Sequence, residues 1–248
     1  NDDPRYMWQT HYSAIAAANQ AIQAIYDLGD PASLAPQKAE ALMCRAYAHF
    51  VLANVFCLPY NPETADKDMG IPYSEKPETQ VIVKYERGTM AELYEKINAD
   101  IEAALPYISD DVYTVPKYHF NKKAAYAFAT RFNLFYVKPD KSNYQKVVEY
   151  ATQVLGSNPD RALRQMTNYI PLGAGDVTNA YVQASENCNL LIIPAYSAAG
   201  RIGSGSGPRY NHGREITTYE TYWAKGPWGS SGSSSFLILG RKLYGSNQ

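Results

Sequence analysis

The feature of this sequence that most restricts its fold is a series of five segments in which apolar residues recur every three or four positions. The segments are residues 8–27, 36–57, 89–105, 121–137 and 142–155. This spacing places the apolar side chains on one face of a helix. Pro36 suits a first helical turn, and Thr89 with Glu92 three residues later predicts a capping box. The sequence therefore predicts a mainly α scaffold over residues 1–156.

Two of these segments share one pattern of small and aromatic residues. Residues 39–50 align with residues 125–136. The matched positions are Ala39 with Ala125, Ala41 with Ala127, and Arg45 with Arg131. Helix pairs with alanine at their contact are tetratricopeptide-like, and such pairs predict a short solenoid of helical hairpins. The alternative is that any two alanine-rich amphipathic helices would align this well.

The rest of the chain carries weaker helical signals. Residues 58–88 contain four prolines and predict a long loop, and residues 190–196 predict a short strand or a buried extended run. Residues 200–235 are rich in glycine, serine and aromatic residues, which predicts a long irregular loop. We therefore expect residues 157–248 to be a loop-rich part of the same domain, packed on the helices and truncated at its C-terminus.

Both ends of the sequence suggest a piece of a longer protein. The first residue is Asn1, and a helical pattern begins almost at once, at about Met7. At the other end, an apolar run at residues 236–239 is followed by no closing element. We expect that a preceding segment carried a secretion signal, which this sequence would then lack.

Composition excludes several classes of protein. The 248 residues include 23 Lys and Arg against 24 Asp and Glu, so the net charge is −1. Nucleic-acid binding would need an excess of cations. No apolar run reaches the roughly 18 residues of a membrane-spanning helix. The three cysteines, Cys44, Cys57 and Cys188, form no CxxC pair, and the helix between the first two would hold them about 20 Å apart, too far for a disulfide.

Catalytic and metal-binding patterns are weak. The four histidines, His11, His49, His119 and His212, are scattered, and the sequence has no HExxH or GxSxG motif. We interpret His49, in mid-helix, as a core residue. Asp66 and Asp68 could both reach a calcium ion, but the glycine and glutamate of an EF-hand loop do not follow. The sequence therefore predicts a protein that is not an enzyme and that has no cofactor or metal.

Aromatic residues point to carbohydrate binding. Tyrosine is unusually common, with 22 residues against 7 phenylalanines. Large, stiff, amphipathic rings suit the apolar faces of sugars, and loops often carry function. The candidates for stacking are Tyr210, Tyr219, Tyr222, Trp223 and Trp228, with Arg209, Asn211 and Arg214 as polar partners. The alternative is that several of these rings only pin their loop to the helices.

An ordered series of residues also carries a family resemblance over about residues 6–156. The series includes Trp8, Tyr12, Asn19, Lys38-Ala39-Glu40-Ala41, Arg45-Ala46-Tyr47, Gly70-Ile71-Pro72, Tyr94, Asp100-Ile101, Asn121-Lys122, Arg131 and Tyr150-Ala151. In this series the chain resembles the SusD/RagB family of outer-membrane glycan-binding lipoproteins. The members of that family are about twice as long.

The resemblance implies a fold, a location and a partner. It implies a tetratricopeptide-like scaffold, and a lipid anchor on a cysteine upstream of residue 1 that holds the protein at the cell surface. It also implies that the protein forms a lid over a TonB-dependent, SusC-like outer-membrane transporter. The resulting hypothesis is a glycan-binding component of a nutrient uptake system. The alternatives are a tetratricopeptide adaptor for peptides or protein partners, a lid for peptide import, and a hydrolase.

Overall fold

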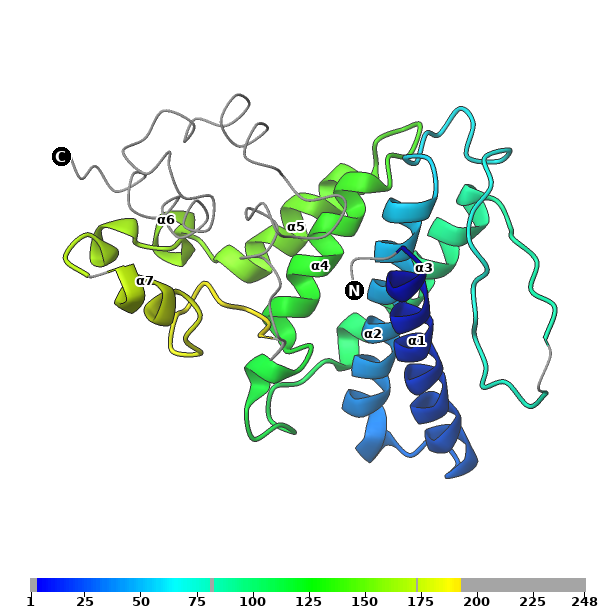
Figure 1. The fold of residues 1–248 in the computed structure, drawn as a ribbon, viewed down its shortest axis with the longest axis horizontal. Helices are drawn as coiled ribbons and strands as arrows, with labels where there is room; N and C mark the ends of the chain where they lie inside the picture. Colours follow the sequence, from blue (N-terminus) through cyan, green and yellow to red (C-terminus); the bar gives the residue numbers. More distant parts are fainter. Residues whose placement is uncertain (1–3, 81–82, 173, 193–248) are drawn as a thin grey trace, which may run out of the picture. The chain divides into compact units, whose positions relative to one another are not determined.

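The fold is known from a computed structural model that describes residues 4–80, 83–172 and 174–192 (Figure 1). The chain divides into two compact units. Residues 3–162 belong to one unit, and the residues from Leu163 onward belong to the other. The first unit contains the five long helices. The division at residue 156 that the sequence suggests stays a prediction.

The five predicted helices are confirmed, with ends shifted by at most a few residues. They are α1 (Pro4–Asp27), α2 (Ala35–Phe56), α3 (Met90–Ala104), α4 (Lys122–Phe135) and α5 (Asn143–Leu155), followed by the short α6 (Pro159–Ala162). Three 3₁₀ turns lie between them, η1 (Ala32–Leu34), η2 (Leu105–Tyr107) and η3 (Pro116–Tyr118). The mainly α fold class is therefore confirmed.

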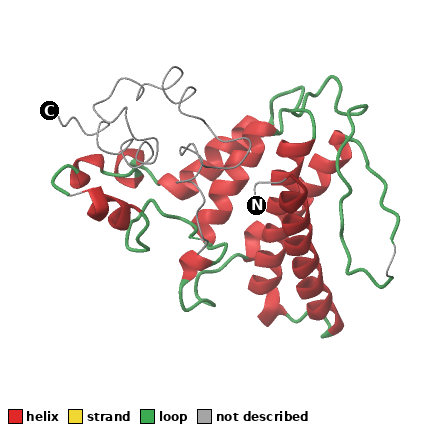
Figure 2. Ribbon diagram, viewed as in Figure 1, coloured by secondary structure: helices red, strands yellow, loops and turns green. Residues whose placement is uncertain are grey.

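The second unit, as far as it is described, is also helical. It contains η4 (Met166–Tyr169) and α7 (Ala174–Tyr181), neither of which was predicted from the sequence. Throughout the described residues Figure 2 shows helices and loops but no strand. Of the two alternatives predicted for residues 190–196, the strand is wrong for residues 190–192, which are half-buried and form no strand. The other four residues of that run lie outside the described part of the chain.

Local side-chain chemistry sets the helix ends. The Thr89 hydroxyl accepts a hydrogen bond from the Glu92 amide (3.2 Å), and the Glu92 carboxylate accepts one from the Thr89 amide (2.8 Å), so the predicted capping box is present. Asn121 caps α4 in a similar way, because its Oδ1 accepts from the Ala124 amide at 3.0 Å. Gly156 ends α5 at a φ of 68°, a value that glycine adopts without strain.

Helices α1, α2 and α3 pack as antiparallel neighbours. α1 lies against α2, and α2 lies against α3. Trp8, near the start of α1, meets Phe56 at the end of α2 with 5.1 Å between ring centroids, which fixes the antiparallel direction. Ala39 and Ala46 are at most 1% exposed, so these small residues do lie at helix contacts.

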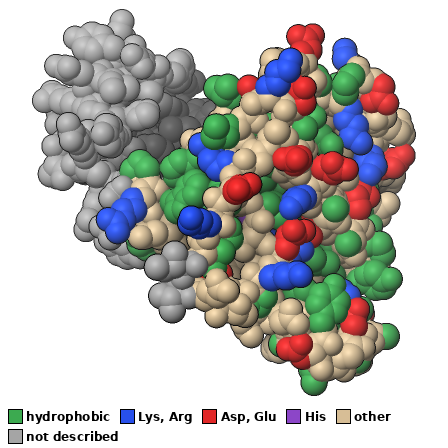
Figure 3. All heavy atoms as spheres, turned by 90° about the vertical axis from the view of Figure 1, so that its right-hand side faces the viewer, with side chains coloured by type: hydrophobic (Ala, Val, Ile, Leu, Met, Phe, Trp, Pro, Cys, Tyr) green, Lys and Arg blue, Asp and Glu red, His purple; other side chains and the backbone are tan. Residues whose placement is uncertain are grey.

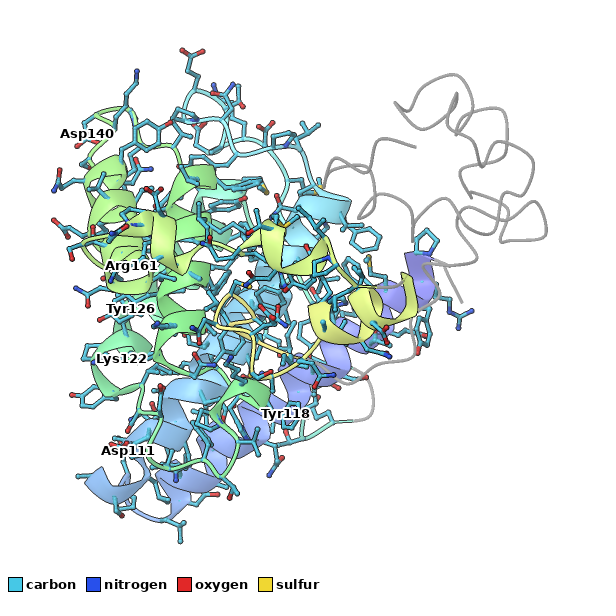
Figure 4. The ribbon with its side chains drawn as sticks, turned by 90° about the vertical axis from the view of Figure 1, so that its left-hand side faces the viewer. Asp111, Tyr118, Lys122, Tyr126, Asp140 and Arg161 are labelled. Atoms are coloured by element: carbon cyan, nitrogen blue, oxygen red, sulfur yellow. The ribbon has the colours of Figure 1, made fainter. Side chains whose placement is uncertain are left out.

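Helices α4 and α5 form a second antiparallel pair beside α2 (Figure 1). Tyr126 of α4 and Tyr150 of α5 approach to 5.6 Å between ring centroids. Figure 4 shows Tyr126 and Lys122 along one side of this pair, with Asp140 in the turn that joins the two helices. The helical-hairpin character of the chain is thus confirmed, whereas a regular solenoid stays a prediction. None of the helices in the described residues is both long and apolar enough to cross a bilayer.

Candidate functional site

A groove with a volume of about 920 Å³ lies between the outer face of α1 and the loop that joins α2 to α3. Both walls belong to the first compact unit. The α1 wall is lined by Trp8, Gln9, Tyr12, Ser13, Ala16 and Gln20, and the loop wall by Pro72, Ser74, Lys76, Pro77, Glu78 and Tyr85. The groove therefore combines three aromatic rings with amide, hydroxyl and charged groups.

The α1 wall presents residues that recur every four positions. Trp8, Tyr12, Ala16 and Gln20 share one helix face, and the rise of a helix spreads them over about 18 Å. The rings of Trp8 and Tyr12 lie 4.8 Å apart, and the edge contact with Phe56 holds Trp8 from behind. Two aromatic side chains are thus held in place along one end of the groove.

Tyr12 ties this helix to the opposite wall. Its hydroxyl donates a hydrogen bond to the Pro72 carbonyl oxygen at 2.7 Å. Burial raises the pKa of Tyr12 above its ordinary value, so the hydroxyl keeps its proton and remains a donor at any physiological pH. The spacing of the two walls is therefore fixed by a direct bond at this point.

Between Met69 and Lys76 the loop wall has the alternation of an extended chain. Pro72, Ser74 and Lys76 line the groove, whereas Met69, Ile71 and Tyr73 line a second hollow on the other side of the same segment. Tyr85 returns to the groove further along the loop, where its hydroxyl donates to the Glu78 carboxylate and the residue is 44% exposed. An exposed ring of this kind can be covered by a ligand without unfolding the protein.

The second hollow, of about 590 Å³, has a different character. It is rimmed by Lys67, Arg87 and Lys96 together with acidic side chains. Two of its cations already serve the loop, since Arg87 Nε donates to the Gly70 carbonyl oxygen at 2.6 Å and Lys96 pairs with Glu75 at 3.1 Å. On the face drawn in Figure 3, cationic and anionic side chains are interspersed. We therefore take the aromatic groove as the candidate binding site.

The groove offers partners for binding. Its titratable side chains in reach of a ligand are a lysine, a glutamate and tyrosines. Within the described ranges, no group of three or more His, Cys, Asp or Glu residues is arranged to hold a metal ion. His49 is fully buried beneath the loop, in accordance with its interpretation as a core residue. Burial also lowers the pKa of His49 to about 3.

The predicted ligand-binding residues cannot be placed. Tyr210, Tyr219, Tyr222, Trp223, Trp228, Arg209, Asn211 and Arg214 all lie outside the described residues, and their role stays a prediction. Tyr12 and Tyr85 were missed as site residues, because their sequence patterns indicate a packing helix and a connecting loop. Ser13 and Gln20 line the same wall as Trp8, and these polar residues were the available signal that this side of the helix is not packed wholly in the core.

One family model matches this chain. The model of the SusD-like family, described as "starch-binding associating with outer membrane", matches residues 1–134, more than half of the chain. No curated protein sequence matches this chain.

Solved structures share the fold. A SusD superfamily protein from Bacteroides thetaiotaomicron VPI-5482 is 24% identical with a TM-score of 0.60, and covers 87% of this chain and 43% of its own. A protein from Bacteroides vulgatus ATCC 8482 named for sugar binding is 20% identical with a TM-score of 0.62, over 84% and 46%. A laminarin-binding SusD-like protein is 21% identical with a TM-score of 0.54, over 82% and 40%. The chain thus spans less than half the length of these proteins.

Proposed function

We propose a function from the premise that this chain belongs to the SusD-like family of starch-binding proteins associated with the outer membrane. The chain is a glycan-binding component of an outer-membrane nutrient uptake system, and it binds oligosaccharide in the groove between α1 and the 72–85 loop. It acts by binding rather than by catalysis. It passes the ligand to a TonB-dependent, SusC-like transporter and is held at the cell surface by an N-terminal lipid anchor.

The observation that carries this proposal is the set of fixed rings in the groove. Trp8 and Tyr12 are held by their neighbours and by the bond to Pro72, so they lose little freedom when a ligand covers them. A sugar ring can lay its apolar face on them, while Ser74 and Gln20 can bond its hydroxyl groups. The length of the groove suits several linked sugars better than one.

The charges of the groove favour a neutral ligand. Lys76 and Glu78 are the charged side chains that line it, and their charges cancel. The glutamate is also engaged by the Tyr85 hydroxyl. A neutral glucan needs no net charge in the groove, whereas a strongly anionic glycan would find no excess of positive charge there to attract it. The laminarin-binding relative of the same fold supports this choice of ligand class.

Titration calorimetry with neutral gluco-oligosaccharides tests the proposal. Tyr85→Ala removes an exposed ring and should weaken binding about 2–12-fold, the effect of losing about 0.5–1.5 kcal/mol of ring stacking. Tyr118→Ala is the matched control, because Tyr118 is similarly exposed (52%) and is not among the residues that line the groove. Equal affinity of the two variants and the native chain would exclude the groove as the glycan site.

The eight predicted residues in segment 209–228 supply a second set of contacts in this proposal. Trp223→Ala and Trp228→Ala should each weaken oligosaccharide binding without a change in thermal unfolding. If both leave the affinity unchanged, the groove acts alone. Binding of peptides with no binding of any glycan would favour the alternative of an adaptor or a peptide-import lid, and release of product from labelled polysaccharide would favour a hydrolase.

A further inference from the structure

A buried polar network lies directly beneath the loop wall of the groove. Arg45 of α2 and Asp100 of α3 form a bidentate pair, with Nε to Oδ2 at 2.7 Å and Nη2 to Oδ1 at 2.6 Å. Both residues are 7% exposed. Asn19 of α1 joins them, because its Oδ1 accepts from Arg45 Nη1 at 2.9 Å. One network therefore connects the three helices.

The network ends on the main chain of the loop. Asn19 Nδ2 donates to the carbonyl oxygens of Ser74 (3.0 Å) and Lys76 (3.4 Å), and Arg45 Nη1 donates to that of Glu75 (3.1 Å). The Ser74 amide in turn donates to His49 Nε2 at 3.2 Å. Three successive carbonyl groups and one amide of the groove wall thus have partners on the helices.

Each of these partners can face in only one way. The Asn19 oxygen is turned to the guanidinium group of Arg45, so its nitrogen must face the loop carbonyls. His49 Nδ1 lies 2.9 Å from the Arg45 carbonyl oxygen and must carry the ring proton, which leaves Nε2 as an acceptor for Ser74. His49 also stacks on Tyr73, with 3.9 Å between ring centroids.

The segment held in this way carries two of the polar side chains that line the groove. Ser74 and Lys76 belong to it, and their backbone groups are those that Asn19 engages. A loop without these bonds would have to be ordered when a ligand arrives, at the expense of affinity. The geometry points to Asn19 and His49 as positioning residues for ligand binding, which hold the loop wall in its binding conformation before the ligand arrives. This inference rests on the proposed function.

Asn19→Asp is the sharpest test. The substitution keeps the shape of the side chain and the oxygen that faces Arg45, but it replaces the amide donor by a second oxygen. That oxygen can accept from the Ser74 hydroxyl, which lies 3.2 Å from Asn19 Nδ2, but it repels the two carbonyl groups that the amide engaged. We expect cooperative unfolding to persist, amide exchange at residues 74–76 to become at least about tenfold faster, and affinity for neutral gluco-oligosaccharides to fall about tenfold. Exchange in α4 and α5 should not change.

Asn133→Asp is the matched control, because Asn133 of α4 is as buried as Asn19 (each 1% exposed). Its Nδ2 also donates to a carbonyl oxygen, that of Ala129 at 2.9 Å, but this partner lies in α4 and not in the loop. This variant should therefore exchange at residues 74–76 and bind glycan like the native chain. If it reproduces the effects of Asn19→Asp, those effects come from general destabilisation and the inference is wrong.

His49→Phe gives a second, independent variant. It keeps a flat ring against Tyr73 and removes the acceptor of the Ser74 amide, so exchange of that amide should accelerate and affinity should fall. Unchanged exchange in both variants overturns the inference, as does faster exchange with unchanged affinity or a failure of both variants to fold. The exchange measurement needs no ligand, so it remains informative if the groove variant Tyr85→Ala shows that the glycan site lies elsewhere.

Discussion

Two arginines at matched positions of α2 and α4 have opposite environments. Arg45 of α2 is buried in a bidentate pair with Asp100, whereas Arg131 of α4 is exposed. The pair α4–α5 is joined by rings such as Tyr126 and Tyr150 and by a buried but uncharged bond from Asn143 Nδ2 to the Asn133 carbonyl oxygen. Its ion pair between Lys146 and Glu102 of α3 lies at the surface. The repeated apolar pattern produces helix packing in both places, and the candidate groove lies on the side of the first copy.

The largest expected effect separates these two arginines directly. Arg45→Ala leaves Asp100 buried without its countercharge and should reduce the free energy of unfolding by about 3–5 kcal/mol. Arg131→Ala should change it by about 0.5 kcal/mol or less, as for most surface substitutions. Denaturant unfolding of both variants measures the difference. Similar losses would mean that the two helix pairs are more alike than their polar contacts indicate.

The next effect concerns pH and belongs to the α1–α3 side. The unfolded chain binds a proton at His49 near pH 6.5, whereas burial keeps the folded pKa at about 3. Between these values the unfolded state holds the extra proton, so stability falls as the pH falls, by about 1.4 kcal/mol per pH unit.

His49→Phe should remove this contribution. Unfolding free energies of the native chain and the variant, compared at pH 6 and pH 4, isolate it from the carboxylates that both proteins share. If the two proteins lose stability equally over this range, His49 is accessible to protons in the folded state and the polar network around it is looser than its hydrogen-bond distances indicate.

The smallest effect is expected on the α4–α5 side. Lys146 bonds Glu102 at 2.7 Å, but its side chain is 38% exposed, and the Tyr150 hydroxyl also donates to this carboxylate. Lys146→Ala should therefore destabilise by about 0–1 kcal/mol, and high salt should diminish the difference. A loss of stability comparable with that of Arg45→Ala would show that the surface ion pair stabilises the fold as much as the buried one.

The sequence predicts well what depends on neighbouring residues. The five helices and the capping box at Thr89 follow from local spacing and local hydrogen bonding, and all are present. Arg45 and Arg131 show where such reasoning ends. Their local contexts match, and only the distant Asn19 and Asp100 decide which one is buried.

The groove was out of reach of the sequence for the same reason. Its walls meet through Tyr12 and Pro72, which are sixty positions apart. The periodicity of α1 does not predict which loop packs against that helix. A short helix such as α7 was missed because its eight residues are too few for a clear apolar periodicity and include Gly175 and Thr178, which have low helix propensity. The aromatic residues of segment 209–228 remain a prediction, since they lie outside the described residues.

The alternation in the loop wall makes its length matter as much as its composition. Suppose that one residue is inserted between Gly70 and Ile71. If the backbone of residues 74–76 keeps its hydrogen bonds, the extra residue must bulge out near Arg87, which bonds the Gly70 carbonyl oxygen. If residues 71–76 shift along the extended segment to absorb the extra residue, each of these side chains turns to the opposite hollow, so that Tyr73 and Glu75 enter the groove in place of Ser74 and Lys76. A two-residue insertion would restore the original parity. Natural or engineered variants of this stretch should therefore tolerate even changes in length better than odd ones.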